Sequence, residues 1–284
     1  MLKTVILGSG NIGTDLMVKC LKSKKLKCLA LVGRSMNSPS LGKANKLGVR
    51  YSDESIEFIE KNYKDIDLVF DATSAKDHIK HSKILKKLGI KVIDMTPARV
   101  GIMAVPVINN ELIKNTNNIN MVTCGGQASI PISYVIKKCF PHVNYIETVS
   151  SIASRSAGPG TRRNLDEYIK TTEEGIRFFS GVRESKAILN LNPANPCIDM
   201  QTTVLAKIDS PNMKTFSLEL DKMIKSVQRY VPGYKIITSP TYEDKRLSVM
   251  IRVKGLGDYL PSYAGNLDII NCAAISVAEN FHQS

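Results

Sequence analysis

The residue with the clearest chemical potential in the sequence is Cys124, which is followed by Gly125 and Gly126. The segment 120–123 is predicted to be a strand, and a helix is predicted to begin near Ser129. A thiol at the carboxyl end of such a strand lies on the ligand-binding edge of a sheet, and the following helix terminus lowers its pKa. The two glycines expose backbone N–H groups that can hold an oxyanion. We therefore predict that Cys124 is a nucleophile, with a small buried apolar side chain as the alternative.

A histidine could serve as the base for this thiol, because an adjacent imidazole is a common activator of a cysteine nucleophile. The four histidines, however, all lie outside the strands predicted for the second half of the chain. His78 and His81 fit one face of a solvated helix, and His142 follows a proline in a connection. We predict structural roles for these three and for His282.

A second candidate site lies at the amino terminus, where residues 8–13 follow the first predicted strand and begin the first helix. Glycines at this place permit a tight turn and let the backbone approach a pyrophosphate at the positive end of the helix. The alternative is that they merely form a tight turn. The dinucleotide contacts predicted from this loop are Gly8, Ser9, Gly10, Asn11, Ile12 and Gly13.

The second predicted strand ends in Gly33-Arg34-Ser35, where a dinucleotide site usually has an acidic residue for the ribose hydroxyls. Arginine can pair with a 2′-phosphate, so NADP is a candidate cofactor beside NAD. Alternatively, Arg34 stacks on the adenine or faces solvent. A comparison of turnover with NAD and NADP separates these interpretations.

The elements that position both sites alternate regularly over about the first 120 residues. Short apolar runs typical of buried parallel strands lie at 4–8, 26–33, 66–72, 91–95 and 119–123. Helical spacing is found between them, at 13–21, 41–47, 55–62 and 78–88. The last of these helices is expected to end at Gly89. This alternation predicts an α/β fold with a Rossmann-type, doubly wound parallel sheet.

The pattern changes from about Tyr145, where longer strand-like segments occur at 145–153, 201–208 and 247–253. Two helices are predicted among them, near 165–178 and 218–230. We therefore expect an α+β second domain with an antiparallel sheet. A final helical segment, 266–284, is expected to pack back on the first domain. The expected domains are 1–127 for dinucleotide binding and 128–265 for catalysis and dimerisation.

Composition restricts the functional classes. The chain has 284 residues, of which 43% are hydrophobic, and this is enough for two domains. Its net charge of +13 is carried by scattered lysines without an aromatic platform, so nucleic-acid binding is not expected. An apolar stretch long enough for a membrane span or a signal peptide is missing, and the cysteines lack a Cys-x-x-Cys pair. We expect a cytoplasmic protein with reduced thiols and no metal site.

Several segments resemble the acylating acetaldehyde dehydrogenases of meta-cleavage catabolism: 8–15, 69–74, 120–128, 156–162, 191–194 and 259–268. The resemblance runs nearly end to end. It implies a glyceraldehyde-phosphate-dehydrogenase-like arrangement of the two domains and a homodimer formed through the second. It also implies oxidation of acetaldehyde by NAD and coenzyme A to acetyl-CoA, often in complex with 4-hydroxy-2-oxovalerate aldolase.

The resemblance implies a role for individual residues. Cys124 would carry the acyl group as a thioester, and NAD would contact residues 9–12. Taken without the resemblance, residues 156–161 read as a surface loop. The further cofactor contacts that the resemblance implies are Ser156, Ala157, Gly158, Pro159, Gly160, Thr161, Arg162, Arg163, Asn164 and Asn266.

The sequence departs from the family pattern in three places. Thr202 stands where the family has an aspartate that is proposed to assist the cysteine. Asp199 could substitute, but a three-residue offset on a strand places it on the other face. A loop before Leu247 is missing, and the chain ends early after Phe281. These departures concern activity, substrate preference and the aldolase partner more than the fold.

Two other functions remain open. One is a semialdehyde or acyl-phosphate reductase of the same architecture, in which Arg155, Arg162 and Arg163 would hold a carboxylate or phosphate and phosphate would replace coenzyme A. The other is a non-catalytic dinucleotide-binding protein, which the missing aspartate favours.

Overall fold

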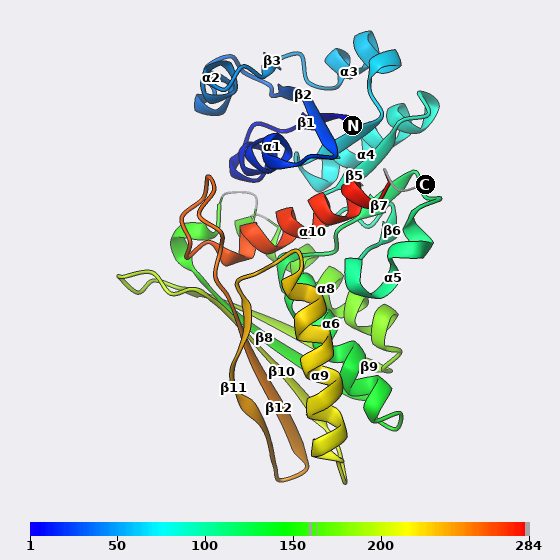
Figure 1. The fold of residues 1–284 in the computed structure, drawn as a ribbon, viewed down its shortest axis with the longest axis vertical. Coiled ribbons are helices and arrows are strands. Elements are labelled where there is room, and N and C mark those ends of the chain that lie inside the picture. Colours follow the sequence, from blue (N-terminus) through cyan, green and yellow to red (C-terminus); the bar gives the residue numbers. More distant parts are fainter. Residues whose placement is uncertain (159–160, 163, 282–284) are drawn as a thin grey trace. The chain divides into compact units, whose positions relative to one another are not determined.

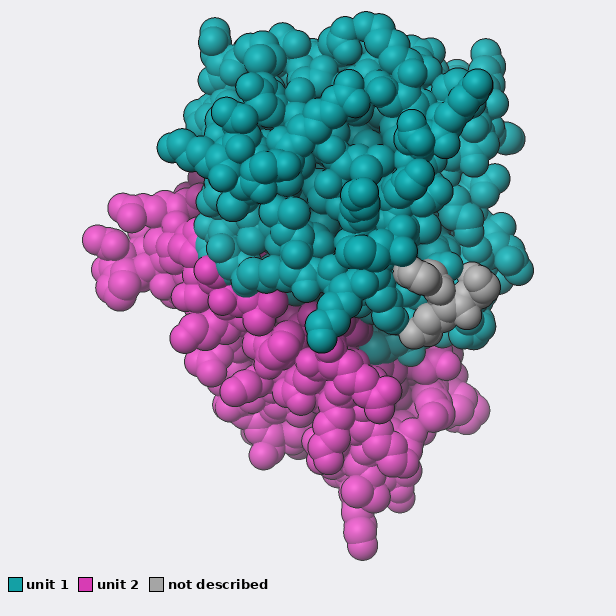
Figure 2. Space-filling view, turned by 45° about the horizontal axis from the view of Figure 1, so that its top comes forward, with its two compact units in different colours: residues 1–121, 258–260, 271–284 teal, residues 122–257, 261–270 magenta. Residues whose placement is uncertain are grey.

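The computed structural model describes residues 1–158, 161–162 and 164–281, and it divides the chain into two compact units (Figure 1). Unit 1 comprises Met1–Met121, Asp258–Leu260 and Asn271–Ser284, shown in teal in Figure 2. Unit 2, in magenta, comprises Val122–Gly257 and Pro261–Ile270. In the described ranges, every helix is too short or too polar to span a membrane.

Unit 1 is built on a seven-stranded sheet with the order β3-β2-β1-β4-β5-β7-β6. All of its strand pairs are parallel, which confirms the doubly wound sheet predicted from the sequence. The strands are β1 (Leu2–Leu7), β2 (Leu26–Val32), β3 (Arg50–Ser52), β4 (Leu68–Asp71), β5 (Lys91–Asp94), β6 (Ile102–Met103) and β7 (Asn118–Asn120). The helices of the crossovers are α1 (Asn11–Lys22), α2 (Pro39–Lys46), α3 (Ile56–Asn62), α4 (Ala75–Lys87) and α5 (Pro106–Ile113).

The central strands of unit 1 are buried because their apolar runs are continuous. Val5 and Val69 are fully buried, and they belong to one apolar cluster with residues of α3 and α4. Helix α4 ends as predicted: Leu88 is its C-cap, and Gly89 follows with a φ of +70°, a conformation that glycine adopts without a steric cost.

Unit 2 contains a five-stranded sheet with the order β11-β12-β10-β8-β9. Three of its strand pairs are antiparallel, but β8 and β9 are parallel, so the predicted antiparallel sheet is in fact mixed. The reason is the helix α8 (Leu165–Ser180), which carries the chain from the end of β8 back to the start of β9. The strands are β8 (Tyr145–Ala153), β9 (Glu184–Asn192), β10 (Met200–Lys207), β11 (Tyr234–Glu243) and β12 (Arg246–Val253).

Three helices cover one face of this sheet (Figure 1): α6 (Cys124–Cys139), α8 (Leu165–Ser180) and α9 (Met213–Gln228). Along β8, Ile146, Thr148 and Ser150 are buried, whereas Glu147 and Val149 between them are half-exposed. The same alternation holds for β10 and β12, so the helices cover one set of side chains and leave the other set open.

Helix α10 (Gly265–Phe281) contributes to both units, because the chain from Asn271 onward belongs to unit 1. There, Ser23 donates a hydrogen bond to Glu279 at 2.6 Å. Asn271 donates to the Asp15 carboxylate at 2.8 Å and to the Ile12 carbonyl at 3.2 Å. The carboxyl-terminal part of α10 thus stabilises the first turns of α1.

Candidate active site

Cys124 is the first residue of α6, so this helix begins earlier than the predicted start near Ser129. Thr123 is the N-cap: its backbone is extended, and its hydroxyl accepts a hydrogen bond from the Gly126 N–H at 2.8 Å. This cap stabilises a first turn that contains two poor helix formers, Gly125 and Gly126. The Gly126 N–H is therefore engaged and is not free for an oxyanion, contrary to the expectation from the sequence.

The turn that leads into α6 is strained. Val122 has a φ of +62°, which is unfavourable for a β-branched residue and costs about 1–3 kcal/mol. Gly126 accommodates this turn, because a Cβ at its position would lie 2.8 Å from the Val122 side chain. The strained turn and the threonine cap together fix Cys124 in the first turn of the helix.

The Cys124 sulfur lies 3.5 Å from the hydroxyl of Tyr168 on α8. Burial raises the pKa of the Cys124 thiol, while hydrogen bonds from Tyr168 and from the Gly125 backbone lower it. The net pKa is above the ordinary value, so the expected lowering is wrong for the protein without substrate. Desolvation of the thiol therefore outweighs its hydrogen-bond donors.

Tyr168 was not predicted from the sequence. Burial raises the pKa of its phenol well above the usual range, and Cys124 adds to the effect. A Cβ at Gly125 would lie 2.2 Å from the phenol oxygen, so the glycine makes room for this contact. No spacing signal could have identified it, since the contact depends on the packing of α6 against α8.

Thr202 is fully buried on β10, and its hydroxyl is 2.9 Å from that of Ser150 on β8. The Ser150 hydroxyl in turn lies 3.4 Å from the position of a Gly125 Cβ. Thr202 is therefore hydrogen-bonded to a serine that lies close to Gly125 at the start of α6. Asp199, the alternative carboxylate, instead approaches Arg252 at 3.9 Å.

The loop after β8 holds several of the predicted cofactor contacts. Ser156 and Ala157 are buried, and the Ser156 hydroxyl donates to the Ala153 carbonyl at 2.8 Å. The Arg162 guanidinium donates to carbonyl groups of its own loop, those of Ser154 and Ala157, at 3.0 Å each. Gly158 has open space where a Cβ would lie. Thr161 and Asn164 are half-buried, and Pro159, Gly160 and Arg163 lie outside the described residues.

Asn266, at the start of α10, is 1% exposed. Its side-chain oxygen accepts no hydrogen bond from the residues that the structure describes. An acceptor buried without a donor is costly, so this oxygen is suited to receive a hydrogen bond from a ligand.

The glycine loop of unit 1 has the geometry of a phosphate cradle. Gly8 has a φ of +119°, and a Cβ at Gly13 would lie 1.8 Å from the Gly8 carbonyl, so both positions require glycine. Gly10 is the N-cap of α1 and provides no side-chain cap, and a Cβ there would meet no atom within 4 Å. Ser9, Asn11 and Ile12 are exposed or half-buried beside these N–H groups. An anion can therefore approach the positive end of α1.

Arg34 follows β2, as predicted, and its side chain is 76% exposed. Its guanidinium lies 3.5 Å from the Asp77 carboxylate at the start of α4. This neighbour offsets part of the positive charge that Arg34 presents at the end of β2.

The prediction of a solvated face for His78 and His81 is wrong, because both side chains are buried in unit 1. Each donates a hydrogen bond to the Asp71 carboxylate at 2.9 Å. His142 is exposed, and His282 lies outside the described residues. Among the described side chains, no group of three or more His, Cys, Asp or Glu residues is suited to hold a metal ion.

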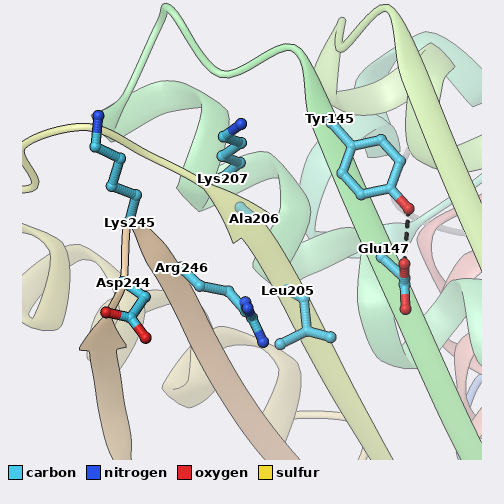
Figure 3. A pocket seen from close by; sticks show the side chains of 8 residues that line it. All are labelled: Tyr145, Glu147, Leu205, Ala206, Lys207, Asp244, Lys245 and Arg246. Atoms are coloured by element: carbon cyan, nitrogen blue, oxygen red, sulfur yellow. Dashed lines mark hydrogen bonds between the residues drawn. The ribbon is translucent and has the colours of Figure 1, made fainter.

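A pocket of about 490 Å³ lies on the open face of the unit 2 sheet (Figure 3). It is lined by Tyr145, Glu147, Leu205, Ala206, Lys207, Asp244, Lys245 and Arg246. Glu147 and Leu205 alternate along their strands with Ser150 and Thr202, which face the helices. The pocket is therefore on the opposite face of the sheet from the surroundings of Cys124, and it is not the candidate active site.

Solved structures share this fold at low sequence identity. The aspartate semialdehyde dehydrogenase from Candida albicans with NADP aligns with a TM-score of 0.73 at 12% identity and covers 99% of this chain and 98% of that one. Aspartate semialdehyde dehydrogenase II from Vibrio cholerae aligns with a TM-score of 0.67 at 13% identity and covers 100% and 99%. These likenesses confirm the predicted fold class.

Two family models match the chain, one for each unit. The semialdehyde dehydrogenase NAD binding domain matches residues 3–116, and the model described as prokaryotic acetaldehyde dehydrogenase, dimerisation, matches residues 124–261. The acetaldehyde dehydrogenase of Spirochaeta aurantia is 56% identical, covering 99% of this chain and 94% of that protein. That of Pectobacterium atrosepticum is 54% identical, covering 96% and 93%. The resemblance seen in the sequence is thus confirmed, and the chain belongs to the prokaryotic acetaldehyde dehydrogenase family.

Proposed function

We propose that this protein oxidises acetaldehyde with NAD and coenzyme A, forming acetyl-CoA and NADH, and that Cys124 carries the acyl group. The observation that supports this most directly is the fixed position of Cys124 in the first turn of α6, in contact with the Tyr168 hydroxyl and the Gly125 N–H. The choice of acetaldehyde as the substrate is supported by the relatives named acetaldehyde dehydrogenase.

In the first step, the Cys124 thiolate attacks the carbonyl carbon and forms a carbon–sulfur bond, and the carbonyl oxygen becomes an alkoxide. The alkoxide then re-forms the C=O bond while the same carbon loses a hydride, which leaves a thioester on Cys124. Bound NAD supplies the acceptor for this hydride. The thiolate of coenzyme A attacks the thioester, and Cys124 leaves as a thiolate. The Gly125 N–H and the Tyr168 hydroxyl are the donors near the sulfur through these steps.

Each unit, considered separately, contains residues suited to contact part of a dinucleotide. In unit 1, residues 9–12 present uncapped N–H groups of α1 to a pyrophosphate, and Arg34 beside Asp77 favours NAD. In unit 2, the buried Asn266 oxygen is available to a donor such as the nicotinamide amide. We propose these residues, with the described part of the loop from Ser156 to Asn164, as cofactor contacts.

Replacing Gly10 with alanine is expected to weaken NADH binding by about 10-fold or more without destabilising unit 1. The new Cβ meets no protein atom, but it occupies the approach to the α1 terminus. Gly42→Ala on α2 is the matched control, because its Cβ is equally free of contacts. Fluorescence titration with NADH measures both variants. Equal affinities in the two would exclude Gly10 from the cofactor site.

Comparing coenzyme A with phosphate as the acyl acceptor tests the proposed function. We expect acetaldehyde-dependent NADH formation with coenzyme A, no turnover when phosphate replaces it, and a lower rate with NADP than with NAD. Arg162 is engaged by its own loop, which argues against a phosphate site there. Turnover with phosphate would instead identify an acyl-phosphate reductase, and NADH binding without turnover would identify a non-catalytic binding protein.

We also propose an oligomeric state and a cellular location for the protein. The match of residues 124–261 to a dimerisation domain supports a homodimer formed through unit 2. Cys124 acts as a thiolate, so we place the reaction in the cytoplasm, where thiols stay reduced. An aldolase that supplies the aldehyde is the partner that the family resemblance implies.

A further inference from the structure

We propose that Tyr168 is a second catalytic residue, whose hydroxyl donates a hydrogen bond to the ionised Cys124 sulfur. This inference rests on the proposed function of Cys124. It assigns to a phenol the assistance that the family resemblance led us to expect from a carboxylate at position 202.

The contact between the two residues is built into the packing of unit 2. The phenol oxygen lies 3.5 Å from the sulfur, within the usual range for a hydrogen bond to sulfur, and Tyr168 is 8% exposed. A Cβ at Gly125 would lie 2.2 Å from this oxygen, so any other residue at that position would displace the phenol. Helix α8 packs along α6 and holds the tyrosine in this place.

The protonation states define what the phenol can do. Burial and the neighbouring Cys124 raise the pKa of Tyr168 well above its usual range, so it keeps its proton. In the thiol form the sulfur donates to the phenol oxygen. After ionisation the direction reverses and the Tyr168 O–H donates to the thiolate. The phenol therefore stabilises the nucleophile and does not act as the base that removes the thiol proton.

Two pairs of neutral hydroxyl groups lie near these two residues in the described part of unit 2. Ser150 and Thr202 are buried and 2.9 Å apart on one side, and Thr123 and Thr172 are 2.7 Å apart near the cap of α6. A carboxylate in their place would repel a thiolate and raise its pKa further. Neutral hydroxyls avoid this repulsion, so they do not oppose the stabilisation of the thiolate by the Tyr168 hydroxyl and the Gly125 N–H.

The test is Tyr168→Phe, which removes the phenol oxygen alone. The pH dependence of Cys124 alkylation by iodoacetamide, with the modified residue identified by mass spectrometry, measures the thiol pKa without substrate. We expect the alkylation curve to shift to higher pH. We also expect thioester formation at neutral pH to slow by about 10- to 100-fold, the effect of losing one hydrogen bond to a charged group.

Tyr234→Phe is the matched control. Tyr234 is fully buried in the same unit, and its hydroxyl donates to the Ala128 carbonyl of α6 at 2.7 Å. A purely structural effect of losing a buried tyrosine hydroxyl at α6 would appear in both variants. The proposal is overturned if Tyr168→Phe and Tyr234→Phe show the same alkylation curve and the same rate.

Two further variants, Gly125→Ala and one without the Cys124 thiol, decide the cases that Tyr168→Phe alone would leave open. If Tyr168→Phe does not fold, Gly125→Ala displaces the phenol by its Cβ and is expected to shift the alkylation curve in the same direction. If removal of the Cys124 thiol leaves turnover intact, the proposed function fails whatever Tyr168 does. If removal of the thiol abolishes turnover while loss of the phenol changes neither curve nor rate, the function stands and this inference fails.

Discussion

Replacing Cys124 with serine is expected to lower aldehyde-dependent NADH formation by about 10⁴-fold or more, as for the loss of other catalytic nucleophiles. A serine hydroxyl ionises far less readily than a thiol. Its neighbours would be the Tyr168 hydroxyl and the Gly125 N–H, which donate hydrogen bonds and do not accept a proton at neutral pH. The variant is measured in the assay with acetaldehyde, NAD and coenzyme A.

Cys139→Ser is the control for this substitution. Cys139 is a free cysteine at the other end of α6, so its replacement makes the same chemical change in the same helix away from the candidate site. We expect full activity from the control. Intact mass spectrometry without coenzyme A should detect an acetyl adduct on the wild type and on Cys139→Ser. Turnover or an adduct in Cys124→Ser would disprove the role of Cys124.

The sequence was sufficient to locate Cys124 but not its surroundings. The strand before it and the glycines after it are local features, and they predicted a thiol at the carboxyl end of a strand, shortly before a helix. The helix start was misplaced because glycines are poor helix formers, and the Thr123 cap and burial of α6 override this propensity. Tyr168 lies 44 residues away on another helix, so the contact could be found only from the packing of α6 against α8.

Strand prediction succeeded for the inner strands of both sheets and missed the four edge strands, β3, β6, β9 and β11. β9 and β11 are long, but nearly all of their side chains are half-buried or exposed, so they lack a clear apolar pattern. β3 and β6 contain three and two residues, too few to show any periodicity. The parallel pairing of β9 with β8 depends on the crossover by α8 and not on the side chains of either strand. Local patterns thus established both sheets, while the pairing of their edges is a property of the tertiary structure.

The buried histidines of unit 1 show a further limit of local patterns. His78 and His81 are three residues apart on α4 and resemble a polar helix face, although they point into the protein toward Asp71. The signal that could have revealed this is the pair of carboxylates at strand ends, Asp71 on β4 and Asp94 on β5. A buried carboxylate needs donors, and two histidines on the adjoining helix can supply them.

Asp71→Ala is expected to lower the free energy of unfolding by about 3–5 kcal/mol, the usual cost of removing one partner from a buried charged pair. The Asp71 carboxylate is fully buried and accepts hydrogen bonds from His78 and His81 at 2.9 Å and from the Thr73 hydroxyl at 2.5 Å. Without it, two buried imidazoles and the turn after β4 lose their partner. Chemical denaturation followed by circular dichroism measures the loss. Asp65→Ala, at an exposed position in the same unit, should change stability by less than about 0.5 kcal/mol.

The stability difference between wild type and Asp71→Ala depends on pH, and the direction of the change can be derived separately for low and for high pH. Burial alone would raise the pKa of Asp71, but the hydrogen bonds from His78 and His81 outweigh it and lower the pKa from 3.8 to about 2. The resulting stabilisation, about 2 kcal/mol, is complete above pH 4 and is lost as the pH falls toward 2. Burial likewise opposes the protonation of His78, yet Asp71 and Asp94 raise its pKa above 6.5, so its contribution is lost as the pH rises through the raised value.

The stability difference between wild type and Asp71→Ala should therefore be largest between about pH 4 and pH 6.5 and should shrink in both directions. Asp94 has the opposite sign to Asp71: burial raises its pKa to about 6, so its carboxyl favours the folded state when protonated and this contribution is lost as the pH rises from about 4 to 6. A stability difference that stays constant from pH 2 to pH 8 would mean that Asp71 is held as a neutral packing group. In that case Asp71, His78 and His81 would all be uncharged in the folded protein.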